Sequence, residues 1–166
     1  NTFGWRTSHG WQGLAADKYV LLRNGILMIQ ASNHAGGFQA TFSNSGSTAT
    51  ADLPIAKGGQ SQGFGPHELI EAGLATCMVI TARMYAIEHG WPLSDASCQV
   101  GIERTATGDV TFVYSVILHG LNQEQEQKLS TLLSQCPVAK TLSKPATMRL
   151  ERINDPPSPS SESKLR

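Results

Sequence analysis

The sequence predicts an α+β fold, in which a largely antiparallel β-sheet packs against helices around one long central helix. An uninterrupted helical pattern runs from Gly65 to Trp91, alternating apolar residues indicate strands on both sides of it, and turn-forming residues separate these strands. The predicted order is three strands, the long helix, two strands, a helix and a last strand. A chain of 166 residues is long enough to bury a real core, so one main domain is expected.

The long helix has clear start and stop signals. Pro66 is a natural first helical residue, and Glu68 places negative charge near the positive end of the helix dipole. Gly90 supplies a left-handed residue after the last turn, and Pro92 prevents continuation. One apolar stripe follows the steps of three and four residues, and most of the remaining positions are apolar too, so we expect the helix to be buried in the middle of the domain. The members of the stripe are Leu69, Gly73, Thr76, Cys77, Ile80, Met84 and Ile87.

Before this helix, the stretches I-L-M-I-Q-A, F-Q-A-T-F-S and T-A-T-A-D-L-P are predicted to be strands separated by two turns. Residues 57–65 form a glycine-rich segment that precedes the helix. A phosphate site is possible at such a place, but the G-K-[ST] ending is missing and Pro66 has no backbone N–H to offer. A flexible linker is the favoured interpretation.

After Pro92 the sequence S-C-Q-V-G-I-E-R and the alternating stretch from Val110 to Leu118 predict a hairpin. Asn122 is predicted to cap a second helix, with Gln125 at the capping-box position. The buried side of this second helix is predicted to carry Leu129, Leu132 and Leu133. Pro137 can start a short helix, and T-M-R-L-E-R-I is predicted to be a last strand. The expected organisation is therefore an N-terminal extension (1–24), a main domain (25–153) and a disordered, polar, proline-rich tail (154–166).

Composition excludes several classes of partner. Thirteen basic and thirteen acidic side chains cancel, so neither nucleic acid nor an anionic membrane is expected as a partner. No apolar run reaches the ~18 residues of a spanning helix. Three cysteines fit no secreted disulfide framework, which favours a reducing, cytoplasmic location.

The candidate reactive residues are cysteines. The histidines are scattered and neither C-x-x-C nor H-E-x-x-H occurs, so a metal site is not expected. Cys77 lies in the long helix, and Cys136 lies immediately before Pro137, where the N–H groups of the next turn would favour a thiolate. A cysteine taken alone is more often a small hydrophobic residue, and Cys98 on its strand keeps that interpretation.

Two separated stretches form recognisable motifs: residues Pro66 to Cys77 have the pattern P-x-E-L-x-x-A-x-x-A-x-C, and Cys136 to Leu142 have C-P-V-x-x-x-L. Both resemble the signatures of the OsmC/Ohr family (osmotically inducible protein C and organic hydroperoxide resistance protein). The stretches A-D-L-P-I-A-K-G-G and H-G-W-P-L extend the likeness, which covers about residues 25 to 153.

The resemblance implies an intertwined homodimer with sheets packed around two central helices. It also implies a peroxidase of small hydrophobic peroxides that acts in oxidative-stress defence. Cys77 would be the peroxidatic residue, which becomes a sulfenic acid, and Cys136 the resolving residue, which joins it in a disulfide. An external dithiol would then reduce that disulfide, and no bound cofactor or metal is expected.

The chain departs from the family pattern at the supporting groups. The well-known hydroperoxide-reducing branch has a glutamate directly after the motif proline, paired with an arginine from the N-terminal strands. Here that position is His67, with Glu68 one step later, and residues 25–53 contain no arginine. Ten residues separate His67 from Cys77, about 15 Å along a helix, so either substitute would have to act across a dimer interface. Arg83 is more simply a surface or interface charge.

Two hypotheses follow. The first is a divergent thiol peroxidase in which His67 or Glu68 replaces the missing ion pair. The second is a binding module for a hydrophobic small molecule whose cysteines are inert.

Overall fold

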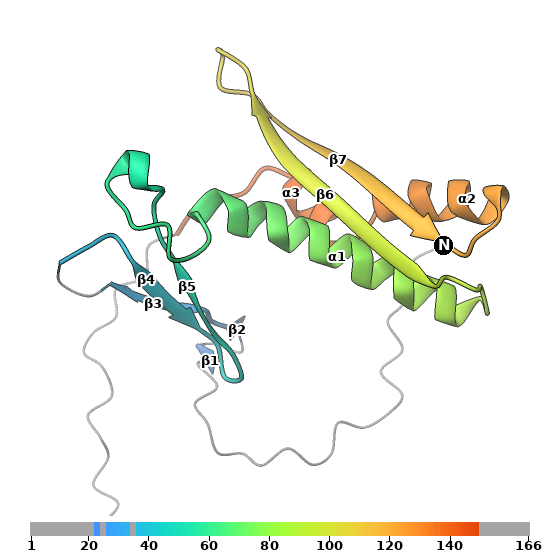
Figure 1. The fold of residues 1–166 in the computed structure, drawn as a ribbon, viewed down its shortest axis with the longest axis horizontal. Coiled ribbons are helices and arrows are strands. Elements are labelled where there is room, and N and C mark those ends of the chain that lie inside the picture. Colours follow the sequence, from blue (N-terminus) through green and yellow to red (C-terminus); the bar gives the residue numbers. More distant parts are fainter. Residues whose placement is uncertain (1–21, 24–25, 34–35, 150–166) are drawn as a thin grey trace, which may run out of the picture. The chain divides into compact units, whose positions relative to one another are not determined.

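The computed structural model describes residues 22–23, 26–33 and 36–149, and it confirms the α+β class. Figure 1 shows the elements along the chain. They are β1 (Leu22–Arg23), β2 (Ile26–Leu27), β3 (Gln30–Asn33), β4 (Ala40–Ser43), β5 (Thr48–Ala51), the 3-10 helix η1 (Ile55–Lys57), α1 (Pro66–Glu88), β6 (Asp95–Arg104), β7 (Val110–His119), α2 (Gln123–Leu133) and α3 (Pro137–Leu142). The N-terminal extension and the tail predicted from the sequence lie almost wholly outside the described residues.

The chain divides into two compact units, which are described separately. The first takes in the strands before α1, the start of that helix up to Ala75, and residues 99–114 of the β6–β7 hairpin. The second takes in the rest of α1 from Thr76, the base of the hairpin, α2 and α3. Both motif cysteines belong to the second unit.

In the first unit, β3, β4 and β5 form an antiparallel sheet in sequential order. Phe42 of β4 lies opposite Ala31 of β3 and Ala49 of β5. The side chain of Asn44 accepts hydrogen bonds from the backbone N–H groups of Gly46 and Ser47 and so closes the β4–β5 turn, as such side chains commonly do. The predicted strand I-L-M-I-Q-A is in fact split, because β2 ends at Leu27 and pairs back on β1, whereas β3 begins at Gln30.

The glycine-rich segment is an ordered loop, not the flexible linker expected from its composition. Its organising group is the carboxylate of Asp52, which is only 4% exposed. This carboxylate accepts three backbone hydrogen bonds, from Leu53 (2.7 Å), Gln60 (3.0 Å) and Gln62 (3.1 Å). The bond from Gln62, followed by those from Gln60 and Leu53, lowers the pKa of Asp52 below its ordinary value despite burial.

Two glycines allow this loop to close. A Cβ at Gly59 would lie 1.9 Å from the carbonyl oxygen of Leu53, and one at Gly63 would lie 2.5 Å from that of Thr50. Both distances exclude any side chain, so glycine is required by close backbone approach. The loop is thereby fixed against β5 just before α1 begins.

The predicted ends of α1 are confirmed. At its start, a carboxylate oxygen of Glu68 accepts a hydrogen bond from the backbone N–H of Gly65 (2.8 Å). At its end, Gly90 has a φ of +64°, and the N–H groups of Gly90 and Trp91 donate to the carbonyl oxygens of Ile87 and Ala86. This is the Schellman arrangement that a glycine after the last turn favours.

The prediction that α1 is buried on more than one side is wrong for a single protomer. The helix buries one face, which carries Leu74, Met78, Ala82, Tyr85 and Ala86. Within the predicted stripe Ile80, Met84 and Ile87 are 58%, 46% and 73% exposed. Both faces are apolar, and the sequence does not tell which one the chain itself covers. Length and composition alone would allow α1 to cross a membrane, but helices in the cores of globular domains pass the same test.

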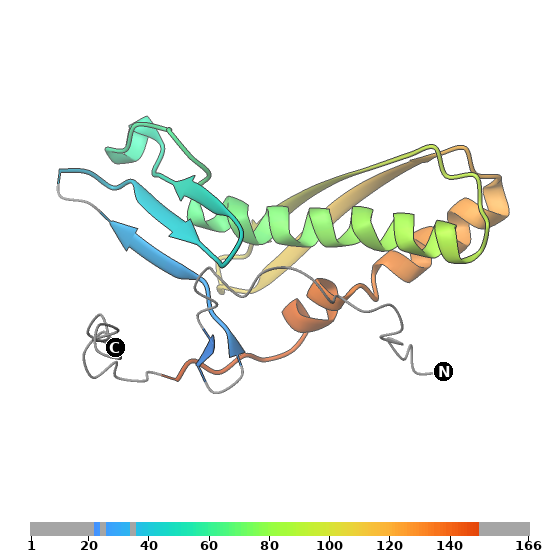
Figure 2. The same ribbon diagram turned by 90° about the horizontal axis from the view of Figure 1, so that it is seen from below.

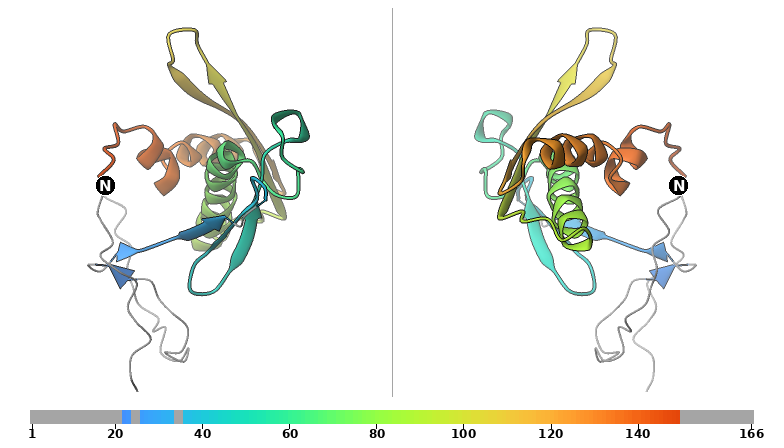
Figure 3. Two further views of the ribbon diagram at one scale, coloured as in Figure 1. Left: turned by 90° about the vertical axis from the view of Figure 1, so that its left-hand side faces the viewer. Right: turned by 90° about the vertical axis from the view of Figure 1, so that its right-hand side faces the viewer.

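In the second unit, α2 and α3 lie beside α1 (Figures 2 and 3). The capping box of α2 is present as predicted, since Asn122 and Gln125 each accept a hydrogen bond from the other's backbone N–H. Leu129 and Leu133 of α2 are fully buried, whereas Leu132 is only half-buried. Leu93 before β6 and Leu118 of β7 are also buried and complete this core.

The hairpin of β6 and β7 is also confirmed, and β6 alternates between half-buried and exposed residues, as predicted. The guanidinium of Arg83 donates to the carbonyl oxygens of Leu93 and Ser94 and so ties α1 to the segment that enters β6. The predicted last strand is wrong where it can be followed, because residues 147–149 form no strand. The rest of that stretch lies outside the described residues.

We expect Asp52→Asn to destabilise the fold at neutral pH, because the amide cannot accept all three backbone hydrogen bonds with a full negative charge. A lowered folded-state pKa means that the contribution is fully present above the ordinary value of 3.8 and is lost as the pH falls through the folded value. Urea denaturation at pH 7 and at increasingly acidic pH measures this, and the gap between wild type and variant should close in acid. Asp95→Asn, at an exposed position, is the matched control; an equal loss in both variants would contradict the assignment.

Candidate functional site

Cys136 occupies the break between α2 and α3. Its backbone N–H donates to the carbonyl oxygen of Leu133 (3.0 Å), and its carbonyl oxygen accepts from the N–H of Lys140 (3.0 Å). Its sulfur caps α3, because the backbone N–H of Ala139 points at Sγ at 3.4 Å. The residue is 1% exposed. The sequence C-P therefore fixes a buried thiol by ordinary helix-end geometry, with proline at the first position of the new helix.

Cys77 approaches this thiol from α1. It is half-buried and lies at the border between the covered face of the helix, where Met78 is fully buried, and the exposed apolar face. The side chain of Cys77 lies close enough to that of Cys136 to raise the pKa of Cys136, through hydrogen bonding and through its charge. The structure thus brings together the two motif cysteines, which are free thiols far apart along the chain.

The pKa of Cys136 is raised. Burial is the main cause, and the hydrogen bond and charge of Cys77 add to it, whereas the backbone N–H groups of Ala139 and Val138 act in the opposite direction. The sequence predicted that these N–H groups would favour a thiolate at Cys136. They do act in that direction, but the loss of hydration is larger, so the net shift of the pKa is upward.

Cys98 belongs to a different contact. Its thiol donates to the sulfur of Met78 at 3.6 Å, and burial raises its pKa. Both features are those of a packed thiol that remains protonated. This agrees with the interpretation of Cys98 as a small hydrophobic residue.

The structure does not bring the two proposed supporting residues to the cysteine pair. His67 is exposed in the first turn of α1. Glu68 is occupied with the N–H of Gly65 at the start of the helix. A catalytic role for either residue therefore stays a prediction that requires a second protomer.

An aromatic cluster at the end of α1 was missed by the sequence reasoning. The rings of Tyr85 and His89 stack at 3.9 Å, and Trp91 meets the Tyr85 ring edge-on at 5.2 Å. Lys128 of α2 lies 5.9 Å from the centre of the Trp91 ring. The spacing of four residues between Tyr85 and His89 was the available signal. The cluster joins the end of α1 to α2.

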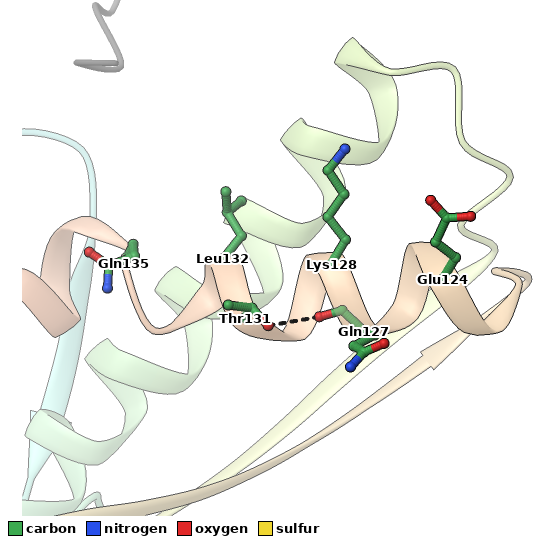
Figure 4. Close-up of a pocket in the computed structure, with 6 residues that line it drawn as sticks. All are labelled: Glu124, Gln127, Lys128, Thr131, Leu132 and Gln135. Carbon is green, nitrogen blue, oxygen red and sulfur yellow. Dashed lines mark hydrogen bonds between the residues drawn. The ribbon is translucent and has the colours of Figure 1, made fainter.

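A hollow along α2 is the other feature that the sequence did not indicate (Figure 4). It is open, its walls come from α2 and the turn that follows it, and neither motif cysteine lines it. Its lining residues are Glu124, Gln127, Lys128, Thr131, Leu132 and Gln135. The hydroxyl of Thr131 is used within the helix, where it donates to the carbonyl oxygen of Gln127.

Comparison with solved structures shows the same fold in several bacterial proteins. A Psychrobacter arcticus protein, described as a candidate osmotic stress induced and detoxification response protein, shares 18% identity with a TM-score of 0.62, over 72% of this chain and 90% of its own. An OsmC-like protein from Mycoplasma pneumoniae shares 20% identity with a TM-score of 0.56, over 70% and 86%. The organic hydroperoxide resistance protein OsmC of Legionella pneumophila shares 21% with a TM-score of 0.53, over 69% and 87%.

No curated protein matches the chain. The model of the OsmC-like protein family matches residues 58–151, more than half of the sequence, and this region includes both cysteines of the contact described above. This chain belongs to the OsmC-like protein family.

Proposed function

We propose that this protein is a thiol-dependent peroxidase that reduces organic hydroperoxides or hydrogen peroxide in oxidative-stress defence in the cytoplasm. The observation that supports the proposal most directly is that the side chain of Cys77 lies close enough to Cys136 to change the pKa of that thiol. Each cysteine lies in one of the two family motifs, and the fold places them against each other. Such a pair suits chemistry in which one sulfur is oxidised and the other captures it.

In the proposed reaction the thiolate of Cys77 attacks one oxygen of the peroxide. An S–O bond forms, the O–O bond breaks, and the other oxygen leaves with a proton as an alcohol or water. Cys77 is then a sulfenic acid. Cys136 attacks that sulfur, water leaves, and a disulfide joins the two residues. A small external dithiol returns both sulfurs to thiols and becomes a disulfide itself, so no bound cofactor is needed.

Burial supports this division of roles. A fully covered sulfur is poorly placed to meet a peroxide first, and Cys136 is 1% exposed with a raised pKa. It would stay protonated until the sulfenic acid forms beside it. Cys77 is half-buried and borders the exposed apolar face of α1, where a peroxide with an alkyl or aryl group finds apolar contacts.

The same apolar face supports a homodimer. Ile80, Met84 and Ile87 lie on one side of α1 at steps of four and three residues and are largely exposed in the protomer. A second copy that covers these side chains would remove them from water and would leave Cys77 in a crevice between protomers. His67 or Glu68 of one protomer could then support the ionised Cys77 of the other.

The second candidate is a binding module for a hydrophobic small molecule, favoured by this exposed apolar face together with the lack of arginine in residues 25–53. In that case the cysteines would be inert, and apolar ligands would raise the melting temperature whatever the redox state.

We expect the protein to consume cumene hydroperoxide with dithiothreitol as reductant, and Cys77→Ser to lower turnover by about a hundredfold or more because it removes the attacking sulfur. Cys136→Ser should allow a single turnover and then stop at the sulfenic acid. Consumption of the peroxide, followed by absorbance or a coupled assay, measures both.

Cys98→Ser is the matched control and should keep its turnover, because its sulfur contacts Met78. Peptide mapping after one equivalent of peroxide should show Cys77 joined to Cys136 within a chain. Turnover no higher than that of Cys77→Ser would exclude the peroxidase, and stabilisation by apolar ligands would then favour the binding module. Pairing with Cys98 would refute the roles assigned here.

The pKa of Cys136 should lie above 9.0 in the Cys98→Ser protein, and adding Cys77→Ser should lower it, because the charge of Cys77 no longer opposes a second thiolate. The ¹³Cβ chemical shift of Cys136, followed against pH by NMR, reports this residue alone. The contact would be contradicted if Cys136 titrated at the same pH with and without Cys77.

Sedimentation should show a dimer, and Ile80→Glu should raise its dissociation constant by at least about tenfold, because a charge would be buried in the covered face. Gln127→Glu adds the same charge on the exposed side of α2 and should leave the association unchanged. A monomeric wild type at micromolar concentration would contradict the homodimer.

A further inference from the structure

We infer that reduction of the Cys77–Cys136 disulfide is directional: the external thiol attacks the sulfur of Cys77, and Cys136 is the leaving group. This inference rests on the proposed function, because it concerns the second half of the same cycle. It assigns a separate task to each sulfur after the peroxide has left. The first intermediate is then a mixed disulfide on Cys77.

Access is the first argument. Cys136 is 1% exposed within a single protomer, so its cover does not depend on a partner. Hydrogen bonds at its N–H and its carbonyl oxygen, made with α2 and α3, hold the residue in the turn. Cys77 is half-buried, and Ile80 and Met84, one and two turns further along the same face, are largely exposed.

The geometry of exchange strengthens this argument. A thiolate attacks a disulfide sulfur from the side opposite the bond that breaks. For an attack on Cys136 that approach would have to come through the covered side of a residue that is almost wholly enclosed. For an attack on Cys77 it comes from the border of the exposed apolar face.

The chemistry balances with a dithiol as the only co-reactant. Its first thiolate forms a bond to Sγ of Cys77 while the Cys77–Cys136 bond breaks, and the electron pair of that bond goes to Sγ of Cys136, which takes up a proton. The second thiol of the reductant, after losing its proton, attacks the reductant's own bound sulfur. This releases Cys77 as a thiolate and leaves the reductant as a cyclic disulfide.

One effect opposes this direction. Thiols with a raised pKa leave more slowly, and burial raises the pKa of Cys136. The hydrogen bonds from the N–H groups of Ala139 and Val138 reduce that penalty, because they stabilise negative charge on the departing sulfur. The pKa of the leaving thiol changes the rate of exchange only gradually, whereas an enclosed sulfur cannot be reached by the attacking thiol at all. Access to the two sulfurs therefore decides the direction of reduction.

Trapping the mixed disulfide tests the inference. Two samples of the Cys98→Ser protein are oxidised in parallel, one with one equivalent of diamide and the other with one equivalent of cumene hydroperoxide. Mass spectrometry then verifies the Cys77–Cys136 disulfide in each sample. A small monothiol, 2-mercaptoethanol, is then added for increasing short times before quenching with N-ethylmaleimide. Peptide mapping measures the amount of each adduct at each time. Extrapolated to zero time, the mercaptoethanol adduct on Cys77 should exceed that on Cys136 by at least about tenfold, and the maleimide should be found on Cys136.

Equal adducts, or an excess on Cys136, would overturn the inference. The two oxidants distinguish this inference from the proposed function. If diamide forms the disulfide and the peroxide does not, the peroxidase proposal is refuted, but the direction of reduction can still be measured on the protein oxidised with diamide. Failure of both oxidants to join the two cysteines would overturn both proposals. The Cys136→Ser protein loaded with the same adduct on Cys77 provides the mass standard.

Discussion

The contact between the two thiols depends on which face of α1 the chain itself covers. The helix is apolar on two sides, and the side that carries Met78 and Ala82 is buried, as are Leu129 and Leu133 of α2. This choice leaves Cys77 at the border of the covered face and sets it against the turn that holds Cys136. Had the chain covered the opposite face, Cys77 would still lie on α1, but the two motifs would have no reason to meet.

Burial also sets the properties of the pair. Helix-end geometry aims the N–H of Ala139 at the sulfur of Cys136, yet the net effect on that thiol is a raised pKa, because the loss of hydration is the larger contribution. A helix N-terminus therefore does not by itself make a thiolate. It lowers the free energy needed to ionise an enclosed sulfur.

Local signals in the sequence predicted the local structure well. Proline, glycine and Asn122 mark the ends of the helices correctly, and strict alternation located the hairpin, because these features act over a few residues. The predictions that were wrong concern features that depend on tertiary contacts. The order of the glycine-rich loop follows from Asp52, whose three partners are up to ten residues away. The buried side of α1 could not be chosen, because its two faces have nearly the same composition.

At the candidate site, too, the sequence predicted the local features but not the tertiary contacts. The motifs named Cys77 and Cys136, but only the fold brings them into contact, and it places His67 and Glu68 in the first turn of α1 instead. Because nine or ten residues separate them from Cys77, neither proposed substitute for the ion pair of the hydroperoxide-reducing branch reaches that sulfur along its own helix. Beside Cys77 the structure places the thiol of Cys136, whose raised pKa favours its protonated form. Burial is the main cause of that shift, so the fold of the chain itself sets the state of the second sulfur.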